Sequence, residues 1–243
     1  MPTPFLSLII PAHNEEQRLP TALQAIAAFL KEQSYSCEVL VIENGSTDRT
    51  YPVACSYIPS MPYLKVFKEE GRGKGLAVRR GMLAATGEYR FYCDVDFSMP
   101  VEEVNHFIPP ALPDMDIAIA SREARGAVRY NEPVYRHLMG RVFNSMVRWM
   151  ALPRLQDTQC GFKCFRAAVA EEIFSRQTMD GWSFDVEVLF IARRWGYRIV
   201  EVPIPWYYDS KSQVRAVADS WNMALSLIDM RRKARQGLYD RPV

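Results

Sequence analysis

Two aspartates one residue apart, Asp94 and Asp96, follow a mostly aromatic stretch at residues 89–93. Side chains alternate along an extended strand, so both carboxylates would point to one side and Val95 to the other. Buried carboxylates that converge repel each other, so we expect a cation between them. A divalent metal that carries substrate phosphates suits this position, because hard cations bind carboxylate and phosphate oxygens together. The alternative is a solvated turn that happens to hold two acids, since Asp-x-Asp is a common pattern.

The surrounding sequence predicts a parallel α/β sheet. Short apolar runs typical of buried strands occur at residues 6–10, 38–42, 64–67, 89–93, 116–120, 161–165 and 198–202. Helical periodicity occurs between them at residues 19–30, 76–85, 135–150, 184–195 and 214–235. The polar stretches 11–15, 43–48 and 94–98 follow predicted strands, and sheets of this class bind ligands beyond the carboxyl ends of their strands. This coincidence favours a ligand site over a solvated turn.

A glycine-rich segment at residues 71–75 precedes the helix predicted at 76–85, with glycine at its first, third and fifth positions. Such a loop before a helix suits the binding of a phosphate, with Lys74 as the charged contact. The spacing matches neither the dinucleotide fingerprint nor the Walker loop. A flexible turn between strand and helix is an equally good interpretation.

Composition is that of a globular protein with a sizeable core. The chain has 243 residues, a hydrophobic content of 49% and a net charge of +2, which is too small to favour nucleic acid. The five cysteines lack zinc-type spacing, so we expect reduced thiols in a cytosolic protein. Neither a signal peptide nor an apolar run of ~20 residues is visible, which predicts a cytoplasmic protein without a transmembrane segment.

Charge separates the last part of the chain from the rest. Residues 211–243 hold seven basic and three acidic residues, a net charge of +4, and the remainder has a net charge of −2. One apolar stripe of the helix predicted there consists of Val217, Trp221, Leu225 and Ile228. We therefore predict one domain at residues 1–210 and a basic amphipathic helical extension at residues 211–243. The extension suits peripheral contact with an anionic membrane face, and packing on its own domain or on a second subunit is the alternative.

The polar strand ends carry the motifs Pro-Ala-His-Asn-Glu at 11–15, Glu-Asn-Gly-Ser-Thr-Asp at 43–48 and Asp-Val-Asp at 94–96. Together they resemble family 2 glycosyltransferases with the GT-A fold, an α/β fold with a mostly parallel sheet flanked by helices. Further motifs at 73–79, 157–163 and 182–187 resemble the dolichyl-phosphate glucosyltransferase branch of that family. The resemblance covers nearly the whole chain up to the predicted extension.

The resemblance implies a nucleotide-sugar donor, a divalent metal (Mg²⁺ or Mn²⁺) and a polyprenyl-phosphate acceptor at a membrane face. Carried over by position, the residues that would hold the uridine are Pro11, Asn14, Glu15 and Glu43. Asp94 would lie near the ribose and the metal, and Asp96 would bind the metal on the diphosphate, with Ser98 as a further ligand. Two departures stand out: Glu43 occupies a position where the family often has Asp, and Phe97-Ser98 replaces smaller residues beside the sugar.

A phosphate acceptor would arrive already ionised, because the second pKa of a phosphomonoester is about 6. A general base would then add little, and a metal would stabilise the charge of the leaving group. We expect direct displacement with inversion at the anomeric carbon. The basic residues that would bind the acceptor phosphate are Arg122, Arg129, Arg136, Arg141, Lys211 and Arg215, with Arg122 the best placed. Asp157 would complete the catalytic set by orienting acceptor or sugar hydroxyls, or would instead cap a loop.

The predicted activity is metal-dependent transfer of glucose from UDP-glucose to a dolichyl-type polyprenyl phosphate. Three alternatives remain from the sequence. In the first, the sugar transferred is mannose and the donor is GDP-mannose. In the second, the chain binds nucleotide sugars without catalysis. In the third, the chain is a nucleotidyltransferase that releases pyrophosphate. The presence of both Asp94 and Asp96 argues against a protein that only binds.

Overall fold

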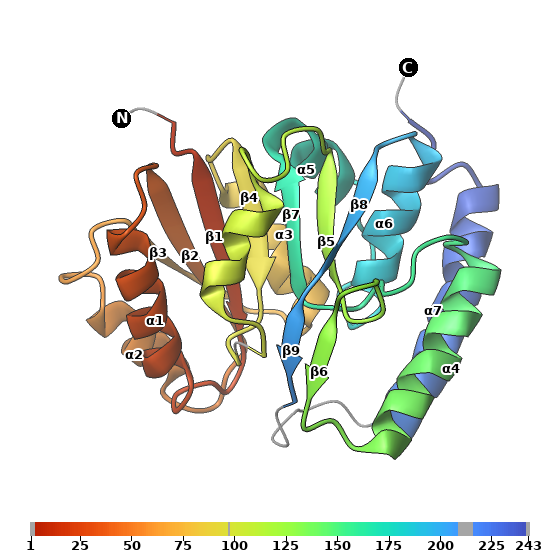
Figure 1. Cartoon of the computed structure of the whole chain (residues 1–243), viewed down its shortest axis with the longest axis horizontal. Helices are drawn as coiled ribbons and strands as arrows, with labels where there is room; N and C mark the ends of the chain where they lie inside the picture. Colours follow the sequence, from red (N-terminus) through yellow and green to blue (C-terminus); the bar gives the residue numbers. More distant parts are fainter. Residues whose placement is uncertain (1–2, 97, 209–215, 242–243) are drawn as a thin grey trace.

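The computed structural model describes residues 3–96, 98–208 and 216–241, except for the side chains of residue 143 and residues 216–224. Seven strands form one sheet in the order β3-β2-β1-β4-β7-β5-β8 (Figure 1). Their bounds are β1 Leu6–Ala12, β2 Cys37–Asn44, β3 Leu64–Glu69, β4 Tyr89–Cys93, β5 Ile117–Ser121, β7 Phe162–Arg166 and β8 Ile199–Pro203. Neighbouring strands are parallel, except that β7 runs antiparallel to both β4 and β5. The predicted mostly parallel α/β sheet is confirmed.

Helices cover both faces of this sheet, as expected when strands are apolar on both sides. Their bounds are α1 Leu19–Lys31, α2 Thr50–Ser56, α3 Lys74–Ala84, the 3₁₀ helix η1 Val101–Phe107, α4 Val134–Met150, α5 Ala167–Phe174, α6 Phe184–Arg194 and α7 Ala216–Arg235. One buried cluster lies under α1 and η1, and a second lies under α3, α5 and α6 on the other face.

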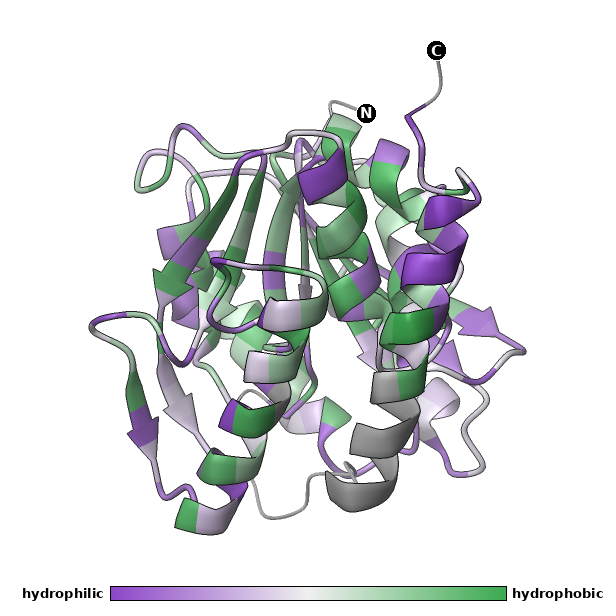
Figure 2. Cartoon of the chain, turned by 90° about the vertical axis from the view of Figure 1, so that its right-hand side faces the viewer, coloured by the Kyte–Doolittle hydropathy of each residue, from purple (hydrophilic) through white to green (hydrophobic). Residues whose placement is uncertain are grey.

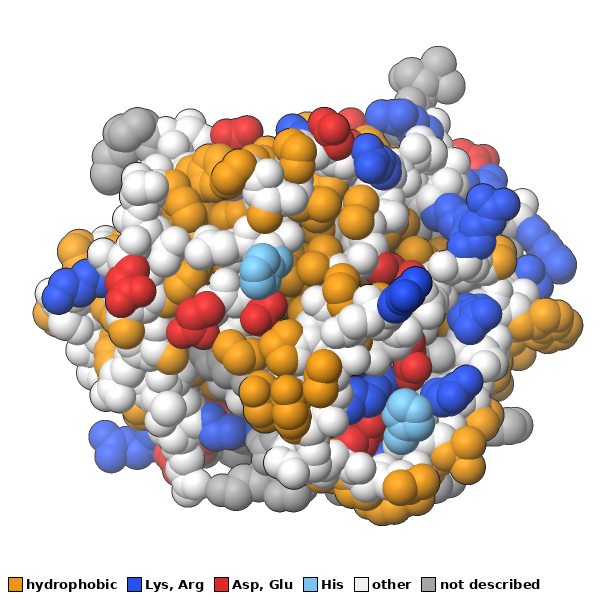
Figure 3. Space-filling model, in the orientation of Figure 1, with side chains coloured by type: hydrophobic (Ala, Val, Ile, Leu, Met, Phe, Trp, Pro, Cys, Tyr) orange, Lys and Arg blue, Asp and Glu red, His pale blue; other side chains and the backbone are white. Residues whose placement is uncertain are grey.

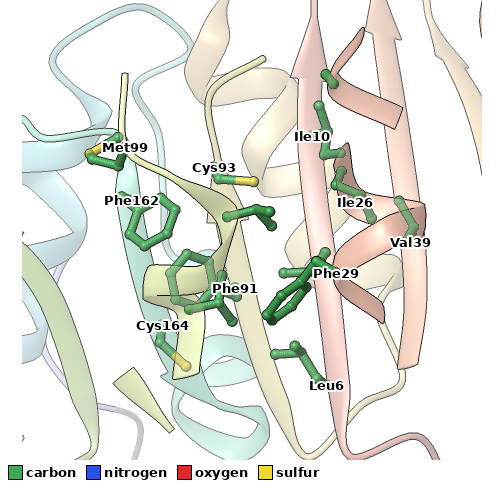
Figure 4. Packing of buried hydrophobic residues seen from close by; sticks show 14 of the residues in the cluster. Leu6, Ile10, Ile26, Phe29, Val39, Phe91, Cys93, Met99, Phe162 and Cys164 are labelled. Carbon is green, nitrogen blue, oxygen red and sulfur yellow. The ribbon is translucent and has the colours of Figure 1, made fainter. Parts of the chain in front are cut away.

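The alternation of side chains along β1 joins the two clusters. Leu8 and Ile10 belong to the cluster under α1, and Ile9 between them belongs to the cluster under α3. Figure 4 shows Ile26 and Phe29 of α1 turned toward the sheet beside β1. Burial of such side chains on both faces fixes the register of the central strand, because a slip by one residue would exchange the two faces.

The polar segments predicted to form the site emerge at one edge of this sheet. Ala12 at the end of β1 pairs with Glu43 of β2, and the parallel pairing of β1 with β4 brings the end of β4 to the same edge. In Figure 1 these carboxyl ends lie at the lower edge of the sheet, away from both termini. The sequence prediction of a shared polar edge is confirmed.

Several short elements lie outside the prediction. Helices η1 and α5 were not expected, and neither was a second, two-stranded parallel sheet formed by β6 (Val128–Tyr130) and β9 (Pro205–Tyr207). Pro203 ends β8, and the chain extends again from Pro205 into β9. A three-residue strand gives too few alternations to reveal a period in the sequence.

Helix α7 covers most of the predicted C-terminal extension and packs on the rest of the protein. Leu227 and Met230 are buried in the cluster shared with α6, and Leu225 and Ile228 point outward. Helix α4 contacts α7, and the two run side by side in Figure 2. The division at residue 210 stays a prediction. Among the described residues, no helix is both long enough and apolar enough to cross a membrane.

Candidate active site

The loops after β1 and β2 are tied together by side chains that bind backbone groups. Asn14 adopts a left-handed conformation with φ 55°, which asparagine tolerates better than most residues. Its backbone N–H donates to Ser46 Oγ at 3.0 Å, and its side-chain Oδ1 accepts from the N–H of Thr47 at 2.9 Å. The N–H of Glu15 donates to Thr50 Oγ1 at 2.7 Å. The predicted uridine-binding segments therefore form one rigid unit.

Pro11 and Glu43 stand where the strands of this unit end. Pro11 has no backbone N–H to donate. The pairing of β1 with β4 ends at Ile9, so Pro11 lies beyond the hydrogen bonds between these two strands and interrupts none of them. Glu43 is buried, and its Oε1 accepts from the N–H of Ser46 at 2.5 Å. The glutamate thus closes the turn after β2. Its role toward a nucleoside stays a prediction.

Glu15 brings a third carboxylate to the two aspartates. Burial raises the pKa of Glu15, and the neighbouring charges of Asp96 and Asp94 add to the rise. Arg18 opposes it through two 2.6 Å contacts with the glutamate oxygens. Because β1 and β4 are neighbouring parallel strands, the loops that follow them leave the sheet at the same edge, and the charges of the two aspartates act on Glu15 there.

Asp94 lies just beyond β4, and Asp96 lies in the turn that follows. The sequence predicted that strand alternation would set the direction of both carboxylates. That prediction is wrong, because both residues lie beyond the strand and the turn sets their placement. The N–H of Asp94 donates to the carbonyl of Gly161 at 3.1 Å. A Cβ atom at position 161 would lie only 2.0 Å from Asp94 Oδ2, so only glycine leaves room for this carboxylate.

Lys74 supplies the cation that contacts Asp94. Its Nζ lies 2.6 Å from Asp94 Oδ1, and the ring of Trp182 lies 5.4 Å away. Burial raises the pKa of Asp94, the Lys74 ammonium lowers it, and the charge of Asp96 raises it further, leaving the pKa above its ordinary value. Burial lowers the pKa of Lys74, but the charges of Asp94, Asp185 and Asp96 together outweigh it and the pKa is raised. Lys74 is thus held as a charged counter-ion of Asp94.

The glycine-rich segment before Lys74 is packed in place. Gly73 has φ 139°, and a Cβ atom there would lie 2.1 Å from the carbonyl oxygen of Asp180. Asn44 Nδ2 donates to the carbonyl of Gly73 at 3.1 Å, which ties the segment to the end of β2. The loop is therefore shaped by its contacts with the segment around Trp182. Binding of a phosphate by Lys74 stays a prediction.

The carboxylates suit a hard divalent cation in their chemistry, but they form only part of a coordination sphere. Asp96 Oδ1 accepts from the N–H of Ser98 at 3.0 Å, which orients the second aspartate. Among the described residues, no group of three or more His, Cys, Asp or Glu side chains is placed to hold a metal. A metal at Asp94 and Asp96 would need further oxygen ligands, which a bound diphosphate can supply. The contribution of Ser98 as a ligand stays a prediction.

Asp157 is fully buried and forms an ion pair with Arg122. The Arg122 Nε and Nη2 atoms lie 2.6 and 2.9 Å from its two oxygens, and the N–H of Arg122 donates at 3.0 Å. Burial raises the pKa of Asp157, but the guanidinium outweighs it and lowers the pKa to about 2. The Asp157 N–H donates to Glu201 Oε1 at 3.0 Å. The carboxylate therefore holds Arg122 at the end of β5.

Three of the predicted acceptor arginines line β9. The guanidinium groups of Arg122 and Arg129 lie 5.3 and 5.8 Å from the Trp206 ring, and that of Arg136 lies 5.3 Å from the Tyr208 ring. Arg129 also pairs with two glutamates, Glu123 and Glu132, each at 2.6 Å. Arg141 lies exposed on α4. Lys211 and Arg215 fall outside the described residues, so the acceptor set stays a prediction.

The buried ion pair of Lys163 and Asp185 was given no role by the sequence prediction. Lys163, in the middle of the buried strand β7, contacts Asp185 of α6 and donates to the carbonyl of Cys160 at 2.6 Å. Tyr92 of β4 donates its hydroxyl to the same aspartate. This network joins β4, α6 and the turn that carries Gly161. Its signal in the sequence is a lysine inside the apolar run at 161–165, since a buried charge requires a partner.

The neighbouring acid Glu187 fixes the loop that leads to Trp182. Its carboxylate accepts from the N–H groups of Thr178 and Met179, at 3.1 and 2.8 Å, and from the hydroxyl of Tyr239 at 2.6 Å. The two acidic residues of the 182–187 motif, Asp185 and Glu187, therefore hold the strands and the loop next to the site in place.

The fold has solved counterparts in enzymes that transfer sugars. Mannosyl-3-phosphoglycerate synthase from Rubrobacter xylanophilus superposes with a TM-score of 0.70 at 16% identity, covering 96% of this chain and 75% of that chain. Glucosyl-3-phosphoglycerate synthase from Mycobacterium tuberculosis, solved with UDP, superposes with a TM-score of 0.68 at 18% identity, covering 99% and 82%. At these identities the likeness concerns the fold, which is that of a GT-A glycosyltransferase.

The sequence comparisons narrow the class to a family. Residues 7–174 match the family described as glycosyl transferase family 2. Among curated relatives, the dolichyl-phosphate β-glucosyltransferase of Dictyostelium discoideum is 32% identical over 97% of this chain and 76% of its own length. The enzymes of the same name from Drosophila melanogaster and Saccharomyces cerevisiae are 34% and 31% identical, covering 84% and 97% of this chain and 68% and 76% of their own. The chain belongs to glycosyl transferase family 2, as its motifs predict, and is a glycosyltransferase.

Proposed function

We propose that this protein transfers glucose from UDP-glucose to the phosphate of a dolichyl-type polyprenyl phosphate, with inversion at the anomeric carbon. The observation that carries the proposal is that Asp94 and Asp96 follow β4 at the edge of the sheet where Glu15 follows its parallel neighbour β1, in a chain whose relatives bear the name dolichyl-phosphate β-glucosyltransferase. These relatives support a glucosyl donor over a mannosyl one.

In this mechanism the rigid unit of the β1 and β2 loops receives the nucleoside. The nucleoside would lie against the ends of these two parallel strands, whose turns are closed by Asn14 and Glu43. Lys74 contacts Asp94 and would exchange part of this contact for a donor phosphate.

The donor site also fits a divalent metal. Glucosyl-3-phosphoglycerate synthase was crystallised with Mg²⁺ and UDP and, separately, with Mn²⁺ and UDP-glucose, which supports binding of a divalent metal here. Asp94 and Asp96 would hold the ion, and when bound it would stabilise the negative charge of the departing diphosphate. Their carboxylates are hard oxygen ligands of the type that either ion prefers.

The acceptor phosphate would meet Arg122 and its neighbours at β9. An ionised phosphate needs no base, so Asp157 would act by holding Arg122 and not by taking a proton. The pKa of about 2 keeps Asp157 charged at neutral pH, which suits this positioning role. A membrane lipid as acceptor also implies a peripheral location at the cytoplasmic membrane face.

The deciding experiment is a donor screen with a short polyprenyl phosphate, Mg²⁺ or Mn²⁺, and detection of the nucleotide released. We expect release of UDP from UDP-glucose only when acceptor is present. Release of GDP from GDP-mannose would move the assignment to a mannosyltransferase. Binding of UDP-glucose without transfer, or release of pyrophosphate, would reject glycosyl transfer to this acceptor.

A further inference from the structure

The outward face of helix α4 carries a row of large apolar side chains. Val134, Tyr135, Leu138, Val142 and Trp149 are between 62% and 84% exposed. With 3.6 residues per turn, these positions fall within an arc of about 100° on the helix. In Figure 3 hydrophobic side chains gather along the lower right edge of the molecule, over the position of α4 in Figure 1, and basic side chains lie beside them.

The side chains of this row are different from those that pack α4 against the rest of the protein. Val147 and Asn144 on the inward side are buried, and Val147 belongs to the core cluster that also contains Leu227 and Met230 of α7. The helix is therefore already anchored through its inward face. A contiguous apolar strip left outside such an anchored helix is typical of a surface that binds something.

The charges on α4 indicate what binds there. The helix contains three arginines and no acidic residue. Arg141 and Arg148 are exposed and lie beside the apolar row. In a symmetric pair of chains the same face meets itself, so these arginines would face arginines. An anionic lipid surface instead offers acyl chains to the apolar row and phosphates to the arginines.

We infer that the outward face of α4 is a membrane-docking surface that rests on anionic lipid, with the helix lying in the interface. The position of α4 agrees with this role. Its first turn carries Arg136, whose guanidinium stacks over Tyr208 next to the ring that holds Arg122. The N-terminal end of α4 therefore lies beside the arginines of β9, with Arg136 about 100° further around the helix than the edge of the apolar row. The docking surface itself does not depend on the proposed function. Only the idea that α4 brings the protein to a lipid acceptor rests on it.

The test is flotation of the full chain with vesicles of phosphatidylcholine alone or mixed with phosphatidylglycerol. We expect binding to the anionic vesicles that weakens as salt is added. The variant L138S/V142S/W149S should bind them about tenfold or more weakly. The matched control I58S/L83S removes two side chains that are each 41% exposed elsewhere on the molecule, and should bind like the unmodified chain.

A second variant tests the charge. R148E should weaken binding to the anionic vesicles and leave circular dichroism and the thermal unfolding midpoint unchanged, because Arg148 is exposed. Equal vesicle binding by the triple variant and the unmodified chain would overturn the inference. Light scattering that reveals a dimer abolished by the triple substitution would also overturn it, in favour of a second copy of the chain.

The inferred docking surface and the proposed reaction can be rejected independently of each other. Transfer to a short polyprenyl phosphate in detergent needs no bilayer, so the triple variant should retain it. Absence of transfer in the unmodified chain would reject the proposed function while the vesicle result stands. Retained transfer with unchanged vesicle binding in the variant would reject the docking surface alone.

Discussion

At the scale of single residues, Gly161 controls the position of the Asp94 carboxylate. A Cβ atom there would come within 2.0 Å of Asp94 Oδ2, so the aspartate must move in G161A. A displacement of about 1 Å at a reacting site costs roughly a hundredfold in rate. We expect a loss of transfer activity of this order, with circular dichroism unchanged.

The matched control for this substitution is G140A. Gly140 lies on α4 with no atom within 4 Å of an added Cβ, and alanine in a helix is more favourable than glycine by roughly 0.5–1 kcal/mol. G140A should therefore keep full activity and unfold at a slightly higher temperature. Equal activity of G161A and G140A would contradict the role of Asp94.

Lys74 is the second residue whose contacts make a sharp prediction. Its ammonium is the cation 2.6 Å from Asp94, and the proposed reaction gives it a donor phosphate as a further partner. K74M should weaken UDP-glucose binding about ten- to hundredfold in calorimetry, the range expected for a charged hydrogen bond. K74R should restore part of the loss. Unchanged affinity in K74M would remove Lys74 from the donor site.

Asp157 predicts a pH dependence of stability. Its pKa in the folded chain is lowered from 3.8 to about 2, so its ionised form stabilises the fold above about pH 4 and this contribution is lost as the pH falls toward 2. D157N would leave Arg122 without its charged partner and should lower the free energy of unfolding by about 3–5 kcal/mol at neutral pH. Urea unfolding should show the difference between D157N and the unmodified chain shrinking below pH 4. A difference that is constant down to pH 2 would contradict the assignment.

At the scale of elements, strand β7 depends on a charge that it buries. Lys163 is fully buried against Asp185 of α6, so K163M should lower the free energy of unfolding by about 3–5 kcal/mol, because it leaves an unpaired buried carboxylate. The double variant K163M/D185N should recover much of this stability, since asparagine is uncharged and still accepts from Tyr92. Urea unfolding measures both. Equal stability of the single and double variants would show that the pair is not coupled.

The elements also mark how far the sequence could predict this structure. The seven strands of the main sheet were predictable, because strands buried on both faces are continuous apolar runs. The placement of Asp94 was not, because β4 ends at Cys93 and the turn beyond it is held by Gly161, which is distant in sequence. Leu138 and Val142 illustrate a third limit. Their spacing identified a helix with an apolar stripe, but periodicity does not tell which neighbour covers the stripe.

At the scale of the whole molecule, the C-terminal segment is expected to be part of the fold and not an appendage. The helix α7 and the residues after it place Leu227, Met230, Ala234 and Tyr239 in the core cluster that contains Val188 and Leu189 of α6. Tyr239 also donates to the buried Glu187, which fixes the loop around Trp182. Stability of the extension and geometry of the site are therefore linked through one carboxylate.

Truncation after residue 215 should for this reason destabilise the whole chain by several kcal/mol, because each large buried side chain contributes about 1.5–3 kcal/mol. Y239F isolates the link to the site and should cost about 1–3 kcal/mol, as Glu187 would lose one buried donor. L225S/I228S is the matched control, since both side chains point outward and their loss should leave the free energy of unfolding within about 0.5 kcal/mol. Urea unfolding of the three variants decides the matter. A truncated chain as stable as the full one would instead establish residues 216–243 as separable, in line with the predicted extension.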